Sequence, residues 1–225
     1  MGGNGTQHTN LHWNGITIKV RQNMPFEKTF FSAVHFRGRI YTFGGYDCYE
    51  KVQLDSCEYY DLKQDRWYNS PVQRPNGTVE YKLHQARSQS SCCVFEENLI
   101  FIFGGYNRDF GTLASIEKFD IVKKKLFKMD LEIPIPVRRF VSMKISTTKI
   151  LLIGGLSENS EELDGVFCFD LDKEYTIEQL DKIDRPGIVD APIILDQIGN
   201  LHLFLENNSG TSPHHHVVYS FLEYS

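Results

Sequence analysis

The sequence predicts an all-β protein built from four related units. Three observations support this class. An apolar run that ends in two glycines occurs at 39–45, 99–105 and 150–155, and a fourth apolar run without glycines follows at 201–205. The units keep a constant register, because an aromatic residue lies 15 or 16 positions after the first glycine position of each. No stretch shows a convincing helical period, so a repeat of strands is favoured over a helical repeat.

Each apolar run is expected to form a strand that is buried on both faces, because it is continuous in Ile, Leu, Phe and Tyr. Short polar turns precede the runs and predict hairpins between the first and second strand of each unit. The glycines at the strand end are expected to let the backbone pack closely against large aromatic residues such as Trp67. The turns are 37–39, 96–98, 146–149 and 196–200.

The second half of each unit also repeats. In the first three units an aspartate directly follows the aromatic residue, and in the first unit Trp67 follows seven residues later. Chain reversals at 63–66, 122–125 and 172–174 are expected to lead into a fourth, outer strand of each unit. The aromatic residues are Tyr60, Phe119, Phe169 and Phe221, the aspartates are Asp61, Asp120 and Asp170, and Leu126 and Thr176 replace the tryptophan.

This combination of Gly-Gly, Tyr-Asp and Trp resembles the kelch repeat family. The resemblance covers roughly residues 25 to 225, clearly in the first two units, fairly in the third and weakly in the fourth. In that family each unit is a four-stranded blade of a β-propeller. The resemblance therefore implies a kelch-type β-propeller with four recognisable blades. They would follow a disordered leader at 1–14 and an outer strand at 15–24, and would occupy 25–80, 81–132, 133–184 and 185–225.

The ring can close in two ways. The fourth unit has three strands and no outer one, so the strand at 15–24 could complete it and close a small four-bladed ring. Alternatively, the four blades are part of a larger ring, because kelch propellers usually have six or seven blades.

Composition excludes several classes of protein. The net charge of −5 argues against a nucleic-acid binder, and no apolar run approaches the roughly 18 residues of a membrane span. The first residues contain no apolar core of a secretory signal, although Gly2 and Thr6 fit the myristoylation pattern without a nearby basic cluster. Five cysteines without C-x-x-C spacing fit reduced thiols. We expect a cytoplasmic protein, free or associated with the cytoskeleton.

The residues that invite a chemical interpretation favour structural roles. Adjacent strand residues point to opposite faces, so His214, His215 and His216 are not expected to bind one metal ion. Cys92 and Cys93 fit small buried thiols, and the lysines at 123–125 fit a solvated turn. We therefore expect no catalytic residue, metal or cofactor, and no enzymatic activity.

The resemblance places the binding surface on one face of the ring. In kelch propellers, partners commonly dock on the loops that follow the Gly-Gly strand and on the segments that lead into each blade. Tyr, Asn and Arg are typical of interaction hot spots, and the arginines would recognise an acidic or Ser/Thr/Glu-rich partner segment. The predicted contact residues are Tyr46, Tyr49, Arg87, Tyr106, Asn107, Arg108, Phe110, Arg138, Arg139 and Arg185.

The sequence therefore predicts a protein–protein interaction module of the scaffold or adaptor type. The first alternative is a structural subunit of a cytoskeletal or other large assembly, as a homo- or hetero-oligomer if the ring is incomplete. The second is a kelch-type enzyme that acts on a sugar or other small molecule. A long segment at 68–86, rich in Pro and Asn-Gly, is expected to be an inserted loop.

Overall fold

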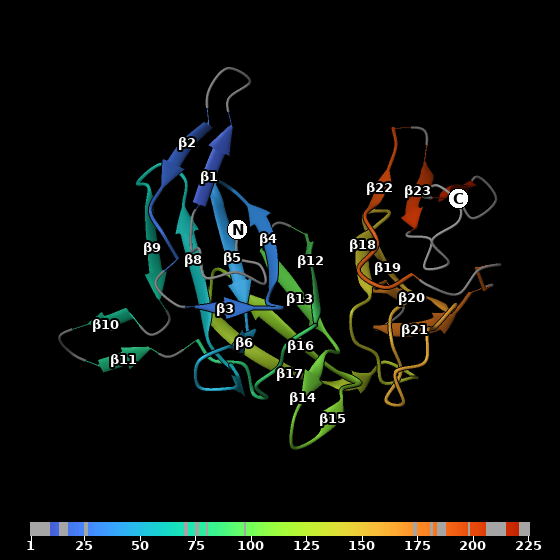
Figure 1. The fold of residues 1–225 in the computed structure, drawn as a ribbon, viewed down its shortest axis with the longest axis horizontal. Coiled ribbons are helices and arrows are strands. Elements are labelled where there is room, and N and C mark those ends of the chain that lie inside the picture. The colour runs from blue at the N-terminus through green and yellow to red at the C-terminus, as the bar shows by residue number, and fades with distance from the viewer. Residues whose placement is uncertain are drawn as a thin grey trace.

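The computed structural model shows four antiparallel sheets arranged along an arc (Figure 1). It describes residues 10–13, 18–24, 27–69, 72–74, 77–79, 81–96, 98–172, 175–180, 182–183, 188–197, 199–205 and 215–220. All regular elements within these ranges are strands. The all-β prediction is therefore confirmed.

Each sheet is one blade, and its strands pair in the order of the sequence. Blade 4 has three strands among the described residues, as the sequence suggested, and Phe221 lies outside them. Among the inner strands of blades 1 to 3 (β4, β12 and β18), β12 contacts both β4 and β18. The strands are β4 (Ser32–Phe36), β5 (Arg39–Phe43), β8 (Cys57–Asp61) and β9 (Arg66–Asn69) in blade 1; β12 (Ser91–Phe95), β13 (Leu99–Phe103), β16 (Ser115–Asp120) and β17 (Lys125–Glu132) in blade 2; β18 (Val141–Lys144), β19 (Lys149–Ile153), β20 (Val166–Asp170) and β21 (Thr176–Gln179) in blade 3; and β22 (Ile193–Leu195), β23 (Asn200–Leu205) and β24 (His215–Ser220) in blade 4.

Short strands outside the blades form small ribbons. Two ribbons lie in the loops after the Gly-Gly pairs of blades 1 and 2, and a third lies inside the segment 68–86, where the sequence predicted only a loop. The ribbons are β3 (Lys28–Thr29) with β6 (Tyr46–Asp47) and β7 (Val52–Gln53), β14 (Tyr106–Asn107) with β15 (Gly111–Thr112), and β10 (Val72–Arg74) with β11 (Gly77–Val79).

The Gly-Gly pairs join each blade to the next. The second glycine, Gly105 in blade 2, donates its N–H to the carbonyl oxygen of Val137 at 2.9 Å. The first, Gly104, has φ of +51°, and a Cβ there would collide with the same oxygen. A left-handed backbone at such close approach favours glycine. Blades 1 and 3 repeat the contact with Gly45 bonded to Arg87 and Gly155 bonded to Ile188, both at 2.8 Å.

The expected contact between these glycines and Trp67 is wrong. The atom nearest to an added Cβ belongs to the segment that leads into the following blade at the first glycine of each pair, and to the segment that leads into the same blade at the second glycine. None of these nearest atoms belongs to a tryptophan. Trp67 instead lies against Tyr60, with ring centroids 5.3 Å apart. Its Nε1–H donates to the carbonyl oxygen of Gln22 at 3.1 Å. Trp67 therefore holds the segment after β2 on blade 1.

The aspartates after the aromatic residues close the turns before the outer strands. Asp120 Oδ1 accepts the N–H groups of Val122 and Lys123 at 3.0 and 2.9 Å. Asp61 does the same for Lys63 and Gln64 at 3.1 and 3.0 Å. This is the local hydrogen bonding that favours aspartate in turns. The repeated Asp is thus explained by the chain reversal.

The core lies between neighbouring blades. Alternate residues of each strand face opposite neighbours, so blades 2 and 3 each contribute to two of the three clusters between blades. Between blades 2 and 3, the ring of Phe169 lies 5.1 Å from that of Phe101 and 5.4 Å from that of Phe103, in edge-to-face contact. These buried faces explain why the strands lack the polar alternation of a sheet with one solvated face.

The N-terminal strand does not complete blade 4 in this structure. β2 (Ile18–Arg21) pairs with β1 (Asn10–Trp13), and within the described residues it belongs to no sheet of a blade. Arg21 Nη1 contacts Asp65 Oδ2 at 3.2 Å, so the end of β2 lies against blade 1. β1 falls inside the leader predicted to be disordered, and the rest of that leader lies outside the described residues. With blades 1 and 4 at opposite ends of the arc in Figure 1, the arrangement favours four blades of a larger ring.

Candidate functional site

The structure brings the loops after the Gly-Gly pairs together with the segments that lead into the blades. In blade 2, the N–H of Tyr106 donates to the carbonyl oxygen of Ser88 at 2.7 Å. In blade 3, the N–H of Leu156 donates to the carbonyl oxygen of Arg138 at 2.7 Å. In blade 1, β6 pairs with β3. The two sets of segments from which the sequence predicted a binding surface therefore share one side of the blades.

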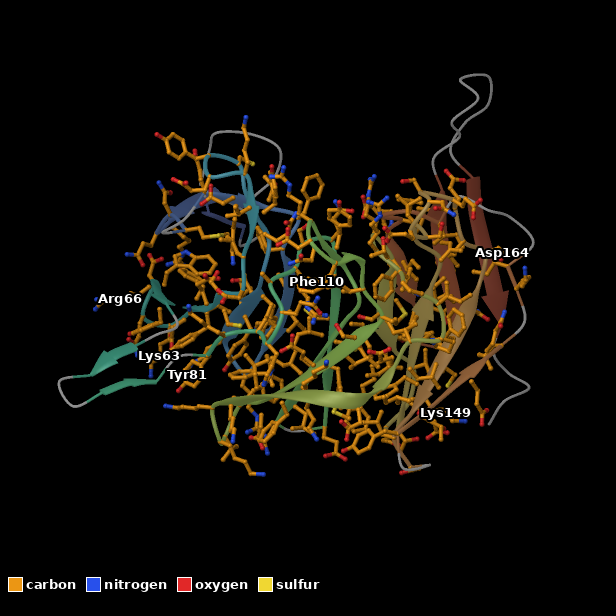
Figure 2. The ribbon with its side chains drawn as sticks, turned by 90° about the horizontal axis from the view of Figure 1, so that it is seen from below. Lys63, Arg66, Tyr81, Phe110, Lys149 and Asp164 are labelled. Carbon is orange, nitrogen blue, oxygen red and sulfur yellow. The ribbon has the colours of Figure 1, made fainter. Side chains whose placement is uncertain are left out.

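Two aromatic side chains are displayed at the tips of these loops. Tyr49 in blade 1 is 83% exposed, and Phe110 in blade 2 is 70% exposed. Phe110 is labelled in Figure 2. The side chain of Asp47 caps the turn before Tyr49 by accepting its N–H at 2.8 Å. Both loops are thus held by local hydrogen bonds while the aromatic rings face solvent.

Asn107 organises the blade 2 loop from inside. Its Oδ1 accepts the N–H of Asp109 at 2.9 Å, and its Nδ2 donates to the carbonyl oxygen of Ala86 at 2.7 Å. Asn107 is only 7% exposed. The prediction that Asn107 contacts a partner is therefore replaced by a structural role in presenting Phe110.

Arg138 lies between the loops of blades 2 and 3. Its guanidinium stacks over the ring of Tyr106, with Cζ 5.3 Å from the ring centroid, and its Nη2 donates to Ser160 Oγ at 2.6 Å. The Nε of Arg138 is buried and has no hydrogen-bond partner among the residues that the structure describes. Across the same junction, the Glu158 carboxylate accepts the N–H of Thr112, which lowers the pKa of Glu158, with a smaller contribution from Arg138. These contacts join two neighbouring loops into one surface.

The other surface arginines differ in how far they are already paired. The side chain of Arg139 donates through Nε to Asp190 Oδ2 at 2.7 Å, and its backbone has φ of +54°. The side chain of Arg108 is exposed, while its backbone N–H donates to Gln53 Oε1 at 3.2 Å and connects the loops of blades 1 and 2. Tyr46 is partly buried on β6. Arg185 lies outside the described residues.

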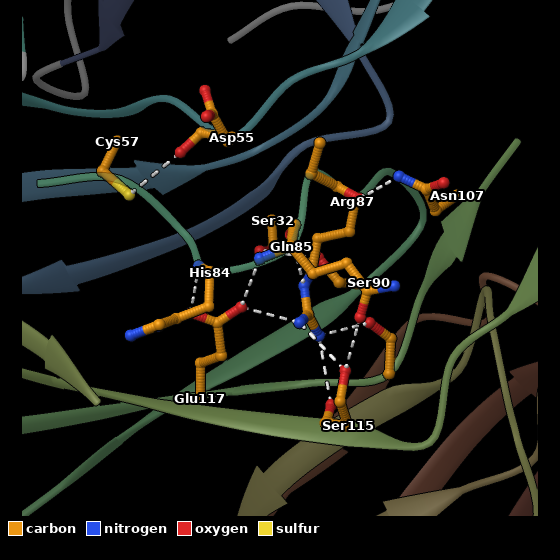
Figure 3. A network of polar contacts seen from close by, with 12 residues as sticks. Ser32, Asp55, Cys57, His84, Gln85, Arg87, Ser90, Asn107, Ser115 and Glu117 are labelled. Carbon is orange, nitrogen blue, oxygen red and sulfur yellow. Dashed lines mark hydrogen bonds and ion pairs between the residues drawn. The ribbon is translucent and has the colours of Figure 1, made fainter. Parts of the chain in front are cut away.

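Arg87 is not part of the surface, contrary to the prediction. Its side chain is fully buried, and its Nη2 lies 2.7 Å from Glu117 Oε1 (Figure 3). Further bonds join Nη1 to the carbonyl oxygens of Gly104 and Ser115 at 2.9 and 3.1 Å. A guanidinium with this set of acceptors holds the blade together and is closed to a partner.

The same arrangement recurs in blade 1 and is replaced in blade 3. Lys28 Nζ is bonded to the Glu58 carboxylate and to the carbonyl oxygen of Gly44, the latter at 2.9 Å. In blade 3 the matching glutamate position holds Phe167, and the matching cation position holds Val137; both pack in the core. Sequence reasoning missed this pair, although a signal existed: Glu58 and Glu117 each precede the repeated aromatic residue by two positions inside an otherwise apolar strand.

The structure also places the histidines and cysteines that the sequence analysis considered. Among the described residues, no group of three or more His, Cys, Asp and Glu side chains is positioned to hold a metal ion. His215 and His216 begin the strand β24, and His214 lies outside the described residues. All five cysteines are free thiols, and burial raises the pKa of Cys93 to about 11. The described part of the chain also has no helix that could cross a membrane.

Comparison with known proteins agrees with this architecture. Residues 28–71 match the kelch motif. Curated relatives include the spermatocyte protein spe-26 of Caenorhabditis elegans, 30% identical over 55% of this chain, and beta-scruin of Limulus polyphemus, 28% identical over 65%. A third, Ras guanine nucleotide exchange factor F of Dictyostelium discoideum, is 27% identical over 60% of this chain. The aligned regions span only 20%, 16% and 11% of these three proteins, respectively.

A solved structure shares the fold. The structure of YjhT superposes with a TM-score of 0.71 at 13% identity, over 87% of this chain and 65% of that one. The match leaves about a third of YjhT without a counterpart in this chain. With a kelch motif in blade 1 and the same residues repeated in register in blades 2 and 3, this chain has the fold of a kelch-type β-propeller.

Proposed function

We propose that this chain is a protein–protein interaction module, of the scaffold or adaptor type, that binds a partner segment on the side carrying the Gly-Gly loops. We call this surface the loop face. It consists of the side chains of Tyr46, Tyr49, Tyr106, Arg108, Phe110, Arg138 and Arg139.

The observation that carries the proposal is the exposure of two large aromatic rings on ordered loops. Tyr49 and Phe110 are 83% and 70% exposed, yet Asp47 and Asn107 fix the turns beside them. Exposed aromatic residues on a pre-organised surface are the residues that dominate binding energy at interfaces. Because the loops are already ordered, a partner would lose less conformational entropy on binding.

The charges of the loop face favour an acidic or Ser/Thr/Glu-rich partner segment. The side chain of Arg108 is exposed, and the partly buried guanidinium of Arg138 lies over the Tyr106 ring. The Nη groups of both arginines can donate to carboxylates or hydroxyls of a partner. Arg139 contributes less, because Asp190 already neutralises it.

A second candidate function, as a structural subunit of a larger assembly, is favoured by the outer side of blade 4. Ile194, Phe204 and Val218 are 55%, 40% and 48% exposed. Ile194 and Val218 are both cross-strand partners of His202 on β23, so they share one side of the sheet with it. An apolar sheet face at the end of an arc of blades suits contact with a further blade of the same ring or of another chain.

Comparative affinity purification tests the interaction proposal. The intact chain, Arg138→Ala, and the double variant Tyr49→Ala/Phe110→Ala are compared with the control Lys125→Ala/Lys128→Ala, which removes two cations from the outer strand β17. The proposal expects a copurifying protein with the intact chain and the control, and its loss with the loop-face variants. Equal recovery by all four chains would contradict it. A fifth chain, Ile194→Ser, changes the outer side of blade 4, and a partner lost only with this variant would support the structural-subunit alternative.

A further inference from the structure

A cavity of about 340 Å³ lies between blades 1 and 2, away from the loop face. Its mouth is formed at the beginning of β5 and at the turn between β16 and β17, which are at the opposite ends of the strands from the Gly-Gly loops. Tyr81, in the segment that leads into blade 2, also lines it. The lining residues are Arg39, Tyr41, Phe43, Cys57, Glu58, Tyr59, Tyr81, Phe119, Ile121, Lys123 and Lys124.

The deep part of the cavity is aromatic. Phe119, which is 5% exposed, is surrounded by Phe43, Tyr41 and Tyr81, with ring centroids at 5.9, 6.0 and 5.8 Å. Tyr59 stacks in parallel on Tyr68 at 4.9 Å. Planar rings arranged in this way offer both faces and edges to another ring. The deep part of the cavity therefore suits a flat aromatic group.

The mouth of the cavity is cationic. The side chains of Arg39 and Lys123 are 42% and 71% exposed, and each is paired with one aspartate, Asp61 at 3.3 Å and Asp120 at 3.4 Å. Lys124 is also exposed and has no carboxylate partner in the described part of the chain. Three cations against two carboxylates leave the mouth with one excess positive charge. Both aspartates are in addition held by the N–H groups of their turns.

We propose that this cavity is a binding site for a small aromatic carboxylate, with its ring between Tyr41, Tyr81 and Phe119 and its carboxylate at Lys124. The volume lies within the range of about 300 to 1,000 Å³ that small-molecule sites occupy, and the lining matches their usual pattern of apolar walls with a few polar groups. Because the cations are at the exposed end and the rings at the buried end, the anionic group of the ligand faces solvent. At the depth of the cavity, the buried carboxylate of Glu58 is already bonded to the buried Lys28. Among the described lining residues no unpaired cation is therefore available there to a buried anionic group, which would be costly to desolvate.

Isothermal titration with defined probes tests the proposal on the intact chain. The probes are phenylacetate and indole-3-acetate, the neutral analogue 2-phenylethanol, and cyclohexylacetate, which has the charge without the aromatic ring. We expect saturable binding of the aromatic acids and weaker binding of the other two probes. No saturable binding of either aromatic acid up to about 10 mM would overturn the proposal.

Two variants locate the binding. Lys124→Glu reverses the charge at the mouth and is expected to weaken binding of the aromatic acids by about threefold or more, while leaving 2-phenylethanol unchanged. Lys128→Glu makes the same charge change on β17 outside the cavity and is expected to affect neither. Cys57→Met, which fills the depth, is expected to abolish binding of all probes, with thermal unfolding as the check on folding. Unchanged affinities in Lys124→Glu would show that the acids bind elsewhere and would overturn the assignment.

Discussion

Arg87 and Glu117 form an ion pair at 2.7 Å between two side chains that have no exposed surface. Blade 1 has the equivalent pair of Lys28 and Glu58, and blade 3 replaces it with an apolar contact. A buried pair of this kind costs desolvation free energy, and an apolar pair of similar volume is often as stable. The repeat therefore accepts either an ion pair or an apolar pair at the same two positions.

Removing one member of the pair is expected to destabilise the propeller strongly. Glu117→Ala leaves the guanidinium of Arg87 buried without its carboxylate, and we expect a loss of about 3–5 kcal/mol in the free energy of unfolding. The double variant Arg87→Val/Glu117→Phe copies the residues of blade 3 and should recover most of that loss. Urea denaturation measures both. A single variant within about 1 kcal/mol of the parent would contradict the assigned role.

The Gly-Gly contact predicts that substitution by alanine lowers the free energy of unfolding by different amounts at two glycines that both have a positive φ. Gly104 has φ of +51° and faces the carbonyl oxygen of Val137, whereas Gly38 has φ of +74° with no atom within 4 Å of an added Cβ. Gly38→Ala should cost only the left-handed strain, about 1–2 kcal/mol. Gly104→Ala should cost clearly more, because it also separates blades 2 and 3. Equal melting temperatures for the two variants would rule out this explanation of the repeat.

The turn aspartates predict a stability that depends on pH. The N–H of Lys123, with further help from its ammonium group, holds the pKa of Asp120 below its usual value. A carboxyl with a lowered folded pKa stabilises the fold above its unfolded pKa, near 3.8, and this contribution disappears as the pH falls through the folded value. Asp120→Asn keeps the Oδ1 acceptor and should lose mainly the pH-dependent part of the stabilisation that Asp120 provides. Asp120→Ala should lose about 1 kcal/mol more at pH 7. Unfolding curves at pH 3 and 7 measure the difference.

The five thiols should react at very different rates. Cys48 is exposed, whereas burial raises the pKa of Cys57 well above its normal value and that of Cys92 to about 12. Since the thiolate is the reactive form, an aromatic disulfide reagent at pH 8 should titrate one thiol at once and the others only as the protein unfolds. Cys48→Ser should remove the fast phase. A fast phase that persists in Cys48→Ser would show that a core strand opens readily.

Much of the fold could be predicted because its determinants are local and repeat. The apolar runs, the turns and the aspartates each act on neighbouring residues, so their period reveals the blades. The role of the Gly-Gly pairs could not be predicted, because Gly104 makes room for Val137, a residue in the next unit. The choice between the two ways of closing the ring could not be predicted for the same reason. Nothing within Ile18–Arg21 specifies whether this strand pairs with β24 or, as in the structure, with β1.

The candidate site could be predicted only in part. The loops and leading segments meet as expected, and the exposure of Tyr49 and Phe110 agrees with their place at loop tips. Arg87 and Arg138 both lie in segments that lead into a blade, but Arg87 is buried, whereas Arg138 directly follows Val137, the match of Arg87, and stacks on Tyr106 near the surface. The burial of Arg87 depends on Glu117, which comes thirty residues later and provides the buried carboxylate that binds the guanidinium. A linear motif does not contain that information.

Site-specific photo-crosslinking tests the proposed loop face most directly. A benzophenone amino acid replaces Phe110 in one protein and the exposed residue Lys128 on β17 in another, and both are irradiated in extract of the native cell. The account predicts a discrete protein adduct from position 110 that is absent from position 128 and is reduced by Arg138→Ala. Adducts of equal yield from both positions, or from position 128 alone, would contradict binding on the loop face.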